Sequence, residues 1–591
     1  MLNLEQRWKV LGACLLVVPL IVLVVLRGLQ RPLTLPLTRV QPAFDAASAI
    51  EYTRRLAENH PDRVTGTPAA AQAADDLSAE FQKLGYKVSR DVFTLWLAGK
   101  RVQGQNVIGE APGEVHEAVV VIAHYDGQFT SHQAAEDNAS GVGVMLELAR
   151  ALRARPHHRG LIFVATDAEE WGMIGARALR GFLHTRNPLA VISIDYLTQG
   201  RSTGVAIDCQ GQRAGYTPLW LRELLEQSGA AQGVPVMGPS AFRQWVEQAL
   251  EVSSQDQGPL LRAGIPAINV STIPADYEAA RARYHSVQDA FENFEPATFQ
   301  MVGATVEQAV ASLDRLDPPA PREMKYLPFA SGKWLDRSSI EWAQVLGLLP
   351  FMLACVLTVL NFEDDDLPHP LWSYLRPLLY LIPLLTGLLA LRALTSSGIL
   401  PRYELYPATP KDPFLYRIPV RVVLPLAAAL ILGYLVVRLL RLFLPPRTES
   451  FAAGKRILCA GMYLVVVWAL YLDPYAMWLL IGPLAYAFLL LQFPSTLARR
   501  LLNAGLLLIG ALPFVAMLVF FGKEIFLGWR ILWYLVLQTA YGVWSTPAAV
   551  VFLLAVSLWI QLFRLGVLAH PKTGPEAAIR GQQIRGRLSS D

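Results

Sequence analysis

The feature that most constrains this fold is a series of long apolar runs in the second half of the chain. Each run is near the length that an α-helix needs to cross a bilayer. Inside a bilayer only helices and closed barrels satisfy the backbone's own hydrogen bonds, so we expect a helical membrane domain. The predicted spans are 342–360, 371–391, 422–437, 457–472, 476–491, 501–521 and 547–563. A further apolar run at 531–537 is too short to span.

An eighth apolar run lies near the N-terminus, over residues 10–26. Arg7 and Lys9 precede this run, and no small-x-small cleavage site follows it, so we expect a membrane anchor rather than a signal peptide. The Pro-rich stretch 31–42 predicts an extended tether. We therefore predict an anchor and tether at 1–42, a globular domain at 43–325, a transmembrane domain of about seven spans at 326–567 and a basic cytoplasmic tail at 568–591.

The basic residues between the spans predict an orientation, because Lys and Arg accumulate on the cytoplasmic side of a membrane. We count the N-terminal anchor as the first of eight spans. The Lys and Arg clusters after the fourth span (422–437), the sixth span (476–491) and the last span (547–563) then all lie on the cytoplasmic side, together with the N-terminus. The globular domain is then non-cytoplasmic, which means the periplasm, or the lumen of the vacuole or endoplasmic reticulum in a eukaryote. The net charge of +4 and the lack of a basic stripe with interleaved aromatics give no reason to expect nucleic acid as a partner.

Within the globular domain, the stretch 118–141 gathers polar residues at the end of a buried strand. Its apolar run of β-branched residues predicts the strand. His124 and Asp126 follow at the strand's end and point to the same side, and Asp137 precedes a helical run. One imidazole and two carboxylates at one sheet edge are what a divalent metal site needs.

Strands and helices alternate through the rest of this domain. The alternation predicts an α/β fold with a mostly parallel sheet and helices on both faces. The predicted strands are 87–97, 103–108, 119–123, 161–166, 191–194, 204–208 and 267–270, and the predicted helices are 43–59, 68–84, 142–152, 173–183 and 297–313.

More polar residues follow the other predicted strands. Glu169 and Glu170 come after one strand, Asp195 after the next, and His285 lies in a later Tyr-His-Ser cluster. The carboxyl ends of parallel strands meet at one edge of a sheet, so these side chains can converge. A pair of zinc ions needs one bridging carboxylate and two further ligands for each ion. The chain offers Asp137 as the bridge, His124 and Asp195 for one ion, and Glu170 and His285 for the other. Glu169 is left beside them, where a general base would take a proton from water.

The motifs HYD, EDNASG, DAEEWG, SID and YHS together resemble the M28 family of co-catalytic zinc metallopeptidases. The resemblance covers about residues 50–313, and RVTGTP also looks like a loop of that family. It implies that Glu169 is the general base, that Glu170 is a ligand and that Asp126 supports the histidine without binding metal. It also implies a cis peptide bond between Asp137 and Asn138. The order of anchor, peptidase and C-terminal spans looks like the membrane-bound branch of vacuolar and endoplasmic-reticulum peptidases, which usually has nine spans.

We therefore expect a hydrolase: a zinc-dependent metalloprotease with two Zn²⁺ ions, attached to the lipid bilayer, that acts on a peptide or protein substrate. Its aminopeptidase-like exopeptidase character is implied by the family resemblance alone. Two alternatives stay open. One is a glutaminyl-cyclase-like acyltransferase with a single zinc, and the other is a catalytically inactive, peptidase-like binding domain. Metal content separates the three, and the sequence leaves the substrate and the oligomeric state open.

Overall fold

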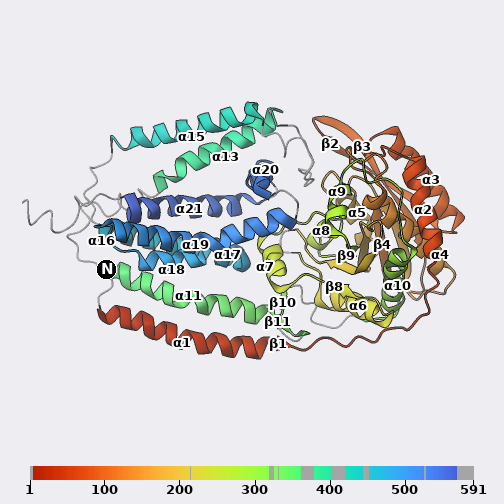
Figure 1. The fold of residues 1–591 in the computed structure, drawn as a ribbon, viewed down its shortest axis with the longest axis horizontal. Helices are drawn as coiled ribbons and strands as arrows, with labels where there is room; N and C mark the ends of the chain where they lie inside the picture. Colours follow the sequence, from red (N-terminus) through yellow and green to blue (C-terminus); the bar gives the residue numbers. More distant parts are fainter. Residues whose placement is uncertain are drawn as a thin grey trace, which may run out of the picture. The chain divides into compact units, whose positions relative to one another are not determined.

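The computed structural model describes residues 4–212, 215–317, 325–329, 332–360, 378–400, 419–443, 451–524, 528–542 and 544–568. The described chain divides into two units, seen in Figure 1. The globular unit is Leu29–Arg337, and the helical unit is made from the described residues of 1–28, 338–400 and 417–591.

An eight-stranded mixed sheet lies at the centre of the globular unit. Its strands are β2 (Lys87–Leu97), β3 (Lys100–Ala111), β4 (Ala118–His124), β5 (Gly160–Thr166), β6 (Pro188–Ile194), β7 (Ser202–Asp208), β8 (Val236–Met237) and β9 (Ala267–Pro274). They lie in the order β2-β3-β5-β4-β6-β9-β7-β8. The four central strands run parallel to one another, whereas β3 and β7 join them antiparallel. The predicted α/β fold is thus confirmed, with a parallel centre and antiparallel pairing toward both edges.

Helices cover both faces of this sheet, as the alternation predicts. Along β4, Val119 and Val121 belong to one apolar core, while Val120 and Ile122 belong to the core on the opposite face, because successive side chains of a strand point to opposite sides. The first core is covered by α2 (Ala46–Asn59), α3 (Pro68–Lys83), α4 (Ser140–Arg153), α6 (Leu219–Ala231) and α10 (Pro296–Leu313). The second is covered by α5 (Ile174–His184) and α8 (Gln257–Arg262). Sequence reasoning missed α6, α8 and the short helices α7 (Ala241–Leu250) and α9 (Tyr277–Arg283).

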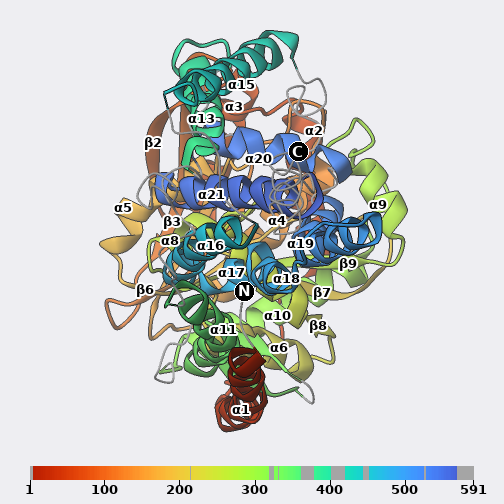
Figure 2. The ribbon, with the colours of Figure 1, turned by 90° about the vertical axis from the view of Figure 1, so that its left-hand side faces the viewer.

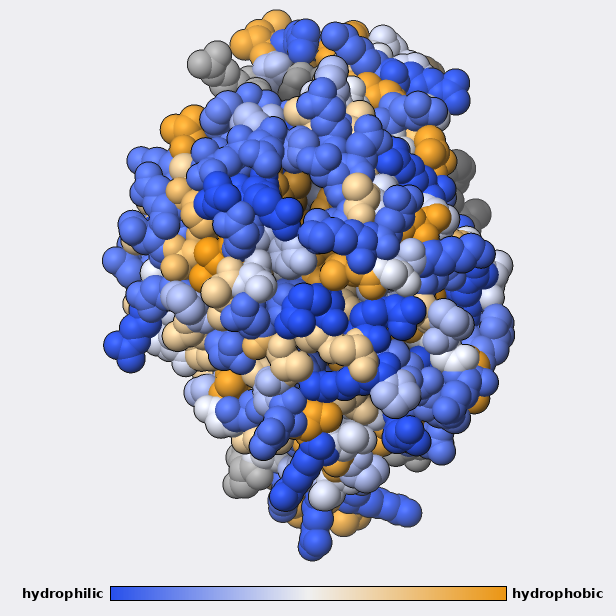
Figure 3. Space-filling model, turned by 90° about the vertical axis from the view of Figure 1, so that its right-hand side faces the viewer, coloured by the Kyte–Doolittle hydropathy of each residue, from blue (hydrophilic) through white to orange (hydrophobic). Residues whose placement is uncertain are grey.

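One face of the globular unit has the surface pattern of a protein in water. The face seen in Figure 3 is largely hydrophilic, and small apolar patches lie between the polar residues. Scattered apolar residues of this kind are normal on a water-exposed surface.

The stretch 31–42 is extended, as predicted, but it is bound to the globular unit. The backbone N–H of Leu33 donates to Glu223 Oε2 at 2.5 Å, and that of Leu35 donates to Gln227 Oε1 at 3.1 Å. Both acceptors lie on α6. These side chains supply partners for backbone groups that are not paired in the main sheet. The stretch is therefore part of the globular unit rather than a free tether.

A small second sheet closes the globular unit where the chain enters and leaves it. Strand β1 (Leu29–Gln30) pairs antiparallel with β11 (Trp334–Asp336), which also pairs with β10 (Tyr326–Pro328). The pairing of β1 with β11 is long-range, so no local pattern marks it. It extends the globular unit beyond the predicted boundaries at 43 and 325.

The helical unit contains ten described α-helices. They are α1 (Leu4–Gly28), α11 (Arg337–Leu360), α13 (Leu381–Ser396), α15 (Val420–Leu440), α16 (Phe451–Leu472), α17 (Pro474–Leu480), α18 (Gly482–Leu490), α19 (Leu497–Glu524), α20 (Ile531–Ala540) and α21 (Thr546–Phe563). Within this unit α16 lies beside α21, and α18 lies beside α19 (Figures 1 and 2). By length and apolar composition, six of the described helices can span a membrane, namely α1, α11, α15, α16, α19 and α21.

These six helices confirm six of the eight predicted apolar segments as long helices. The predicted span 371–391 lies partly outside the described residues, and its described part belongs to the shorter α13. The predicted span 476–491 is not one helix: α17 ends at Leu480 and α18 starts at Gly482. Pro483 is the physical reason, because it has no N–H and its ring clashes with the preceding turn.

Candidate metal centre

The polar residues predicted at the strand ends meet at the carboxyl edge of the central strands. His124 is the last residue of β4 and lies opposite Thr166, the last residue of β5. Glu169 and Glu170 follow β5 within four residues, and Asp195 follows β6 directly. Parallel neighbours end at the same edge of a sheet, so the alternation of strand and helix is what gathers these side chains.

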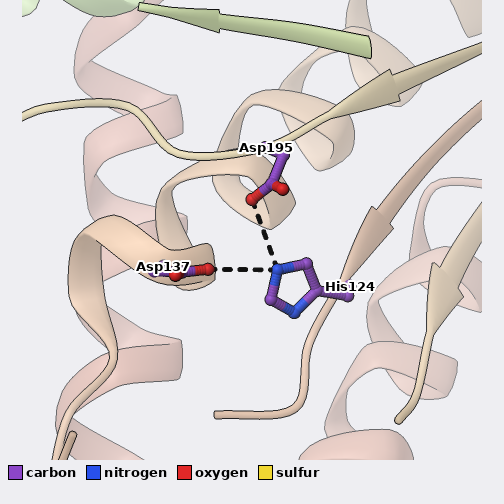
Figure 4. A group of neighbouring side chains, drawn as sticks. All are labelled: His124, Asp137 and Asp195. Carbon is purple, nitrogen blue, oxygen red and sulfur yellow. Dashed lines mark hydrogen bonds and ion pairs between the residues drawn. The ribbon is translucent and has the colours of Figure 1, made fainter. Parts of the chain in front are cut away.

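Asp137 lies between two histidines. Its Oδ1 is 3.2 Å from Nε2 of His124, and its Oδ2 is 3.0 Å from Nε2 of His285. Nε2 of His124 is also 3.3 Å from Asp195 Oδ1, as Figure 4 shows, and Nε2 of His285 is 3.2 Å from Glu170 Oε2. Two groups of three potential metal ligands therefore share one carboxylate.

The spacing of these atoms suits metal ligands better than direct hydrogen bonds. Charge-assisted N–H···O bonds are about 2.7–2.9 Å long, whereas two atoms bound to one tetrahedral zinc at about 2.0–2.1 Å lie about 3.3–3.4 Å apart. The four observed distances are 3.2, 3.3, 3.0 and 3.2 Å. In addition, Oε1 of Glu170 is buried and has no hydrogen-bond partner, which is costly unless something binds it. The residues present thus fit a pair of zinc ions.

Asp137 and His285 reach the site from irregular backbone. Asp137 lies in η1 (Ala135–Ala139) with non-helical dihedral angles, and its peptide bond to Asn138 is cis, as the family resemblance implies. His285 follows α9 with a φ of +50°. The positions of both side chains therefore depend on loop contacts rather than on a regular element.

Asp126 supports the site from behind His124. Its Oδ1 is 3.4 Å from Nδ1 of that imidazole and accepts the backbone N–H of Glu169 at 3.1 Å. Its Oδ2 accepts the backbone N–H of Glu170 and the hydroxyl of Thr65, both at 3.3 Å. One buried carboxylate therefore contacts the imidazole of a candidate ligand and also fixes the turn that carries both glutamates. This position suits the supporting role that the resemblance implies for Asp126.

Burial and the close packing of charges shift the pKa values of the ligand groups. Burial lowers the pKa of His124, but its contacts with the carboxylates of Asp126, Asp137 and Asp195 outweigh burial and raise the pKa well above its usual value. The pKa of His285 is raised to about 10, because the neighbouring carboxylates outweigh burial in the same way. The surrounding carboxylates thus favour the protonated form of both imidazoles, and a metal ion would have to displace those protons.

Glu169 has the properties of a proton-exchanging group. Its side chain is buried, and burial raises its pKa well above the usual range; the charge of His124 lowers the pKa, and the charges of Asp195 and Glu170 raise it. A buried carboxyl group with a raised pKa can accept a proton from water and return it.

Sequence reasoning missed the residue that ties the ligand-bearing loops together. The guanidinium of Arg63 donates to the backbone carbonyls of Tyr125, Gln133 and Ala134 at 2.6, 2.5 and 2.7 Å. The side chain is almost fully buried. The motif RVTGTP (63–68) predicted the correct loop. No local pattern shows, however, that Arg63 reaches three backbone carbonyls far along the chain.

A buried ion pair joins the two segments that carry Asp137 and His285, and sequence reasoning missed it too. Arg283 donates to Oε1 and Oε2 of Glu136 at 2.9 and 3.0 Å. Asp289 accepts the backbone N–H groups of Glu136 and Asp137 at 2.6 and 3.3 Å. The available signal was position: Glu136 precedes Asp137, and Arg283 and Asp289 flank His285.

Comparison with known proteins agrees with this geometry. Residues 106–310 match the model of peptidase family M28. The chain is 35% identical over 173 residues to the alkaline phosphatase isozyme conversion protein of Escherichia coli, covering 25% of this chain and 50% of that protein. It is 27% identical over 214 residues to aminopeptidase YwaD of Bacillus subtilis, covering 35% of this chain and 44% of that protein. The chain thus spans about half the length of these curated relatives.

Solved structures of similar proteins include a zinc aminopeptidase from Bacillus subtilis, with 18% identity and a TM-score of 0.39, covering 46% of this chain and 95% of that one. Another is the glutaminyl cyclase of Bacteroides thetaiotaomicron, with 21% identity and a TM-score of 0.38, covering 46% of this chain and 98% of that one. The family match lies in the globular unit and includes every predicted ligand. Residues 106–310 of this chain are therefore a peptidase family M28 domain.

Proposed function

We propose that this chain is a membrane-anchored di-zinc peptidase of the aminopeptidase type, whose globular unit acts on the non-cytoplasmic side. The observation that carries the proposal is the position of Asp137, whose two oxygens lie 3.2 and 3.0 Å from two different histidines. Each histidine is also close to a carboxylate of its own. A carboxylate shared between two ligand groups is the arrangement expected of a two-metal hydrolytic site.

His124, Asp195, Glu170 and His285 would hold the ions with Asp137 between them. Bound zinc would supply a water of lowered pKa and polarise the scissile carbonyl.

The other parts of the reaction belong to the protein. Glu169 takes the proton of the attacking water and delivers it to the amine of the leaving residue. Asp126 keeps His124 oriented and holds the turn of Glu169 in place through that residue's backbone N–H.

The finer parts of the proposal have separate support. The aminopeptidase type is supported by the curated relative of that name. The membrane attachment is supported by the six long apolar helices among the described residues. The non-cytoplasmic side is supported by the Lys and Arg clusters between the spans.

The test combines metal content and hydrolysis on purified full-length protein. Peptides with free and with blocked N-termini are compared, with and without a chelator, in the wild type, in Glu169→Gln and in the matched control Glu58→Gln, an exposed carboxylate on α2. We expect two zinc ions per chain and cleavage only of peptides with a free N-terminus. Glu169→Gln should keep the zinc and lose at least about 100-fold in kcat, and Glu58→Gln should behave as wild type.

Other outcomes would favour the alternatives. About one zinc ion with cyclisation of N-terminal glutamine would support the acyltransferase. No bound zinc and no turnover of any peptide would refute the peptidase and leave an inactive binding domain.

A further inference from the structure

Two aromatic side chains next to the metal-ligand segments stack on each other. The rings of Phe129 and Trp171 are 6.1 Å apart between centroids, with 23° between their planes. Phe129 lies in the loop between Asp126 and Asp137, and Trp171 directly follows Glu170. The stack therefore links the two loops that deliver most of the site.

Trp171 is fixed relative to the catalytic glutamates. It packs against an apolar cluster that includes Leu95 from β2 and Ile174 from α5. The turn around it is closed by the backbone N–H groups of Gly172 and Met173, which both donate to the carbonyl of Glu169 at 2.8 Å. The indole thus has a rigid apolar backing and a fixed position beside the Glu169–Glu170 turn.

Phe129 is held just as closely to the other side of the site. Its neighbour Thr130 donates a hydroxyl hydrogen bond to the backbone carbonyl of His285 at 2.8 Å and a backbone N–H bond to Oε1 of Gln128 at 2.7 Å. Gln128 is buried, yet the ring of Phe129 is 41% exposed. An aromatic ring that is held in place and still open to water is available for an apolar contact.

We propose that Phe129 and Trp171 form an aromatic wall of the substrate site that selects an apolar or aromatic side chain next to the scissile bond. This inference rests on the proposed peptidase function and adds the substrate class. Both rings are tied to residues of the Glu170–His285 half of the metal centre, so a carbonyl bound there brings the adjacent substrate side chain close to them. A preorganised aromatic surface stabilises such a side chain without further ordering of the protein.

The test uses full-length protein and three dipeptides, Phe-Ala, Ala-Phe and Ala-Ala. The variants are Phe129→Ala, Phe129→Leu, Trp171→Ala and the control Met237→Ala, an exposed apolar residue on the edge strand β8. We expect Phe129→Ala to lower kcat/KM about tenfold for one Phe-containing dipeptide and less than about twofold for Ala-Ala. Phe129→Leu should fall between the wild type and Phe129→Ala, and Met237→Ala should match the wild type. The affected dipeptide shows on which side of the scissile bond the wall lies.

A binding measurement keeps the inference separate from the peptidase proposal. Calorimetry compares the affinity of the same dipeptides for zinc-loaded Glu169→Gln protein with and without Phe129→Ala. A loss confined to one of the two Phe-containing dipeptides supports the wall. An equal loss for all three dipeptides, or no change, in variants that retain their zinc would refute it. If the wild type cleaves no peptide, the proposed function fails and the binding comparison decides the inference alone.

Discussion

Replacing Asp137 by asparagine should release both proposed zinc ions, because this one side chain belongs to both groups of candidate ligands. Its two oxygens lie 3.2 Å from His124 Nε2 and 3.0 Å from His285 Nε2. The substitution removes the negative charge from both groups and replaces one oxygen by an NH₂ group, which cannot bind a metal. Loss of a partner that only supports a ligand costs about 10–100-fold in affinity, so loss of the ligand itself should cost at least about 100-fold for each ion. That is about 2.7 kcal/mol per ion and more than about 5 kcal/mol for the pair.

Three further variants make this prediction specific. Glu170→Gln and Asp195→Asn each change a residue that belongs to only one of the two ligand groups, so each should lower the affinity for one ion only. Asp62→Asn changes an exposed aspartate that pairs with His132 at the surface and should keep both ions. Zinc is measured by atomic emission after dialysis of the full-length protein against chelators of graded strength. If Asp137→Asn loses a single ion, or if Glu170→Gln loses both, the bridging role is refuted.

The other predictions concern protonation and the supporting ion pair. The pKa of His285 is raised to about 10, so zinc binding at pH 7 must release the proton of this imidazole. Competition titrations between pH 6 and 8 should therefore show a zinc affinity that rises about tenfold per pH unit for each released proton. A zinc affinity independent of pH would contradict this prediction. Burial raises the pKa of Glu247 from 4.5 to about 7, so the folded state binds this proton more tightly than the unfolded state, and its contribution to stability is lost as pH rises from about 4.5 to 7. Glu247→Gln should therefore reduce the fall in unfolding free energy over that interval by about 3 kcal/mol relative to wild type. If the unfolding free energies of the two proteins change with pH in parallel, the raised pKa of Glu247 is refuted. Arg283→Met removes the ionic partner of the fully buried carboxylate of Glu136 and should destabilise the protein by about 3 kcal/mol. The added change Glu136→Gln should restore most of this loss, because it removes the buried charge as well. Denaturant unfolding of the single and double variants measures the coupling between the two residues.

The fold of the globular unit was largely predictable because its signals are local. The all-buried strand β4 reads as a continuous apolar run, and β2 has the predicted bounds of 87 and 97. Helix α6 was missed, and it is buried along most of its length, including its charged residues Arg222 and Glu223. The small sheet of β1, β10 and β11 was missed because its strands have two or three residues each and because β1 pairs with β11 across the whole domain.

The candidate ligands were also predictable, since their residue types and order along the chain are distinctive. What surrounds them was not. Arg63 and the Glu136–Arg283 pair act on backbone and side chains far along the chain. The aromatic stack likewise depends on two loops meeting, and neither Phe129 nor Trp171 alone predicts it.

The sequence by itself determined which residues are candidates for the chemistry and where the six long apolar helices lie, because strand ends, apolar runs and ligand types depend on neighbouring residues. Only the tertiary structure decided which oxygen lies near which histidine, which carboxylate lies behind the site, and that the stretch 31–42 is bound rather than free. The physical reason is that these outcomes depend on distances between segments far apart in the chain. Such distances are set by the packing of the whole domain, and no local pattern encodes them.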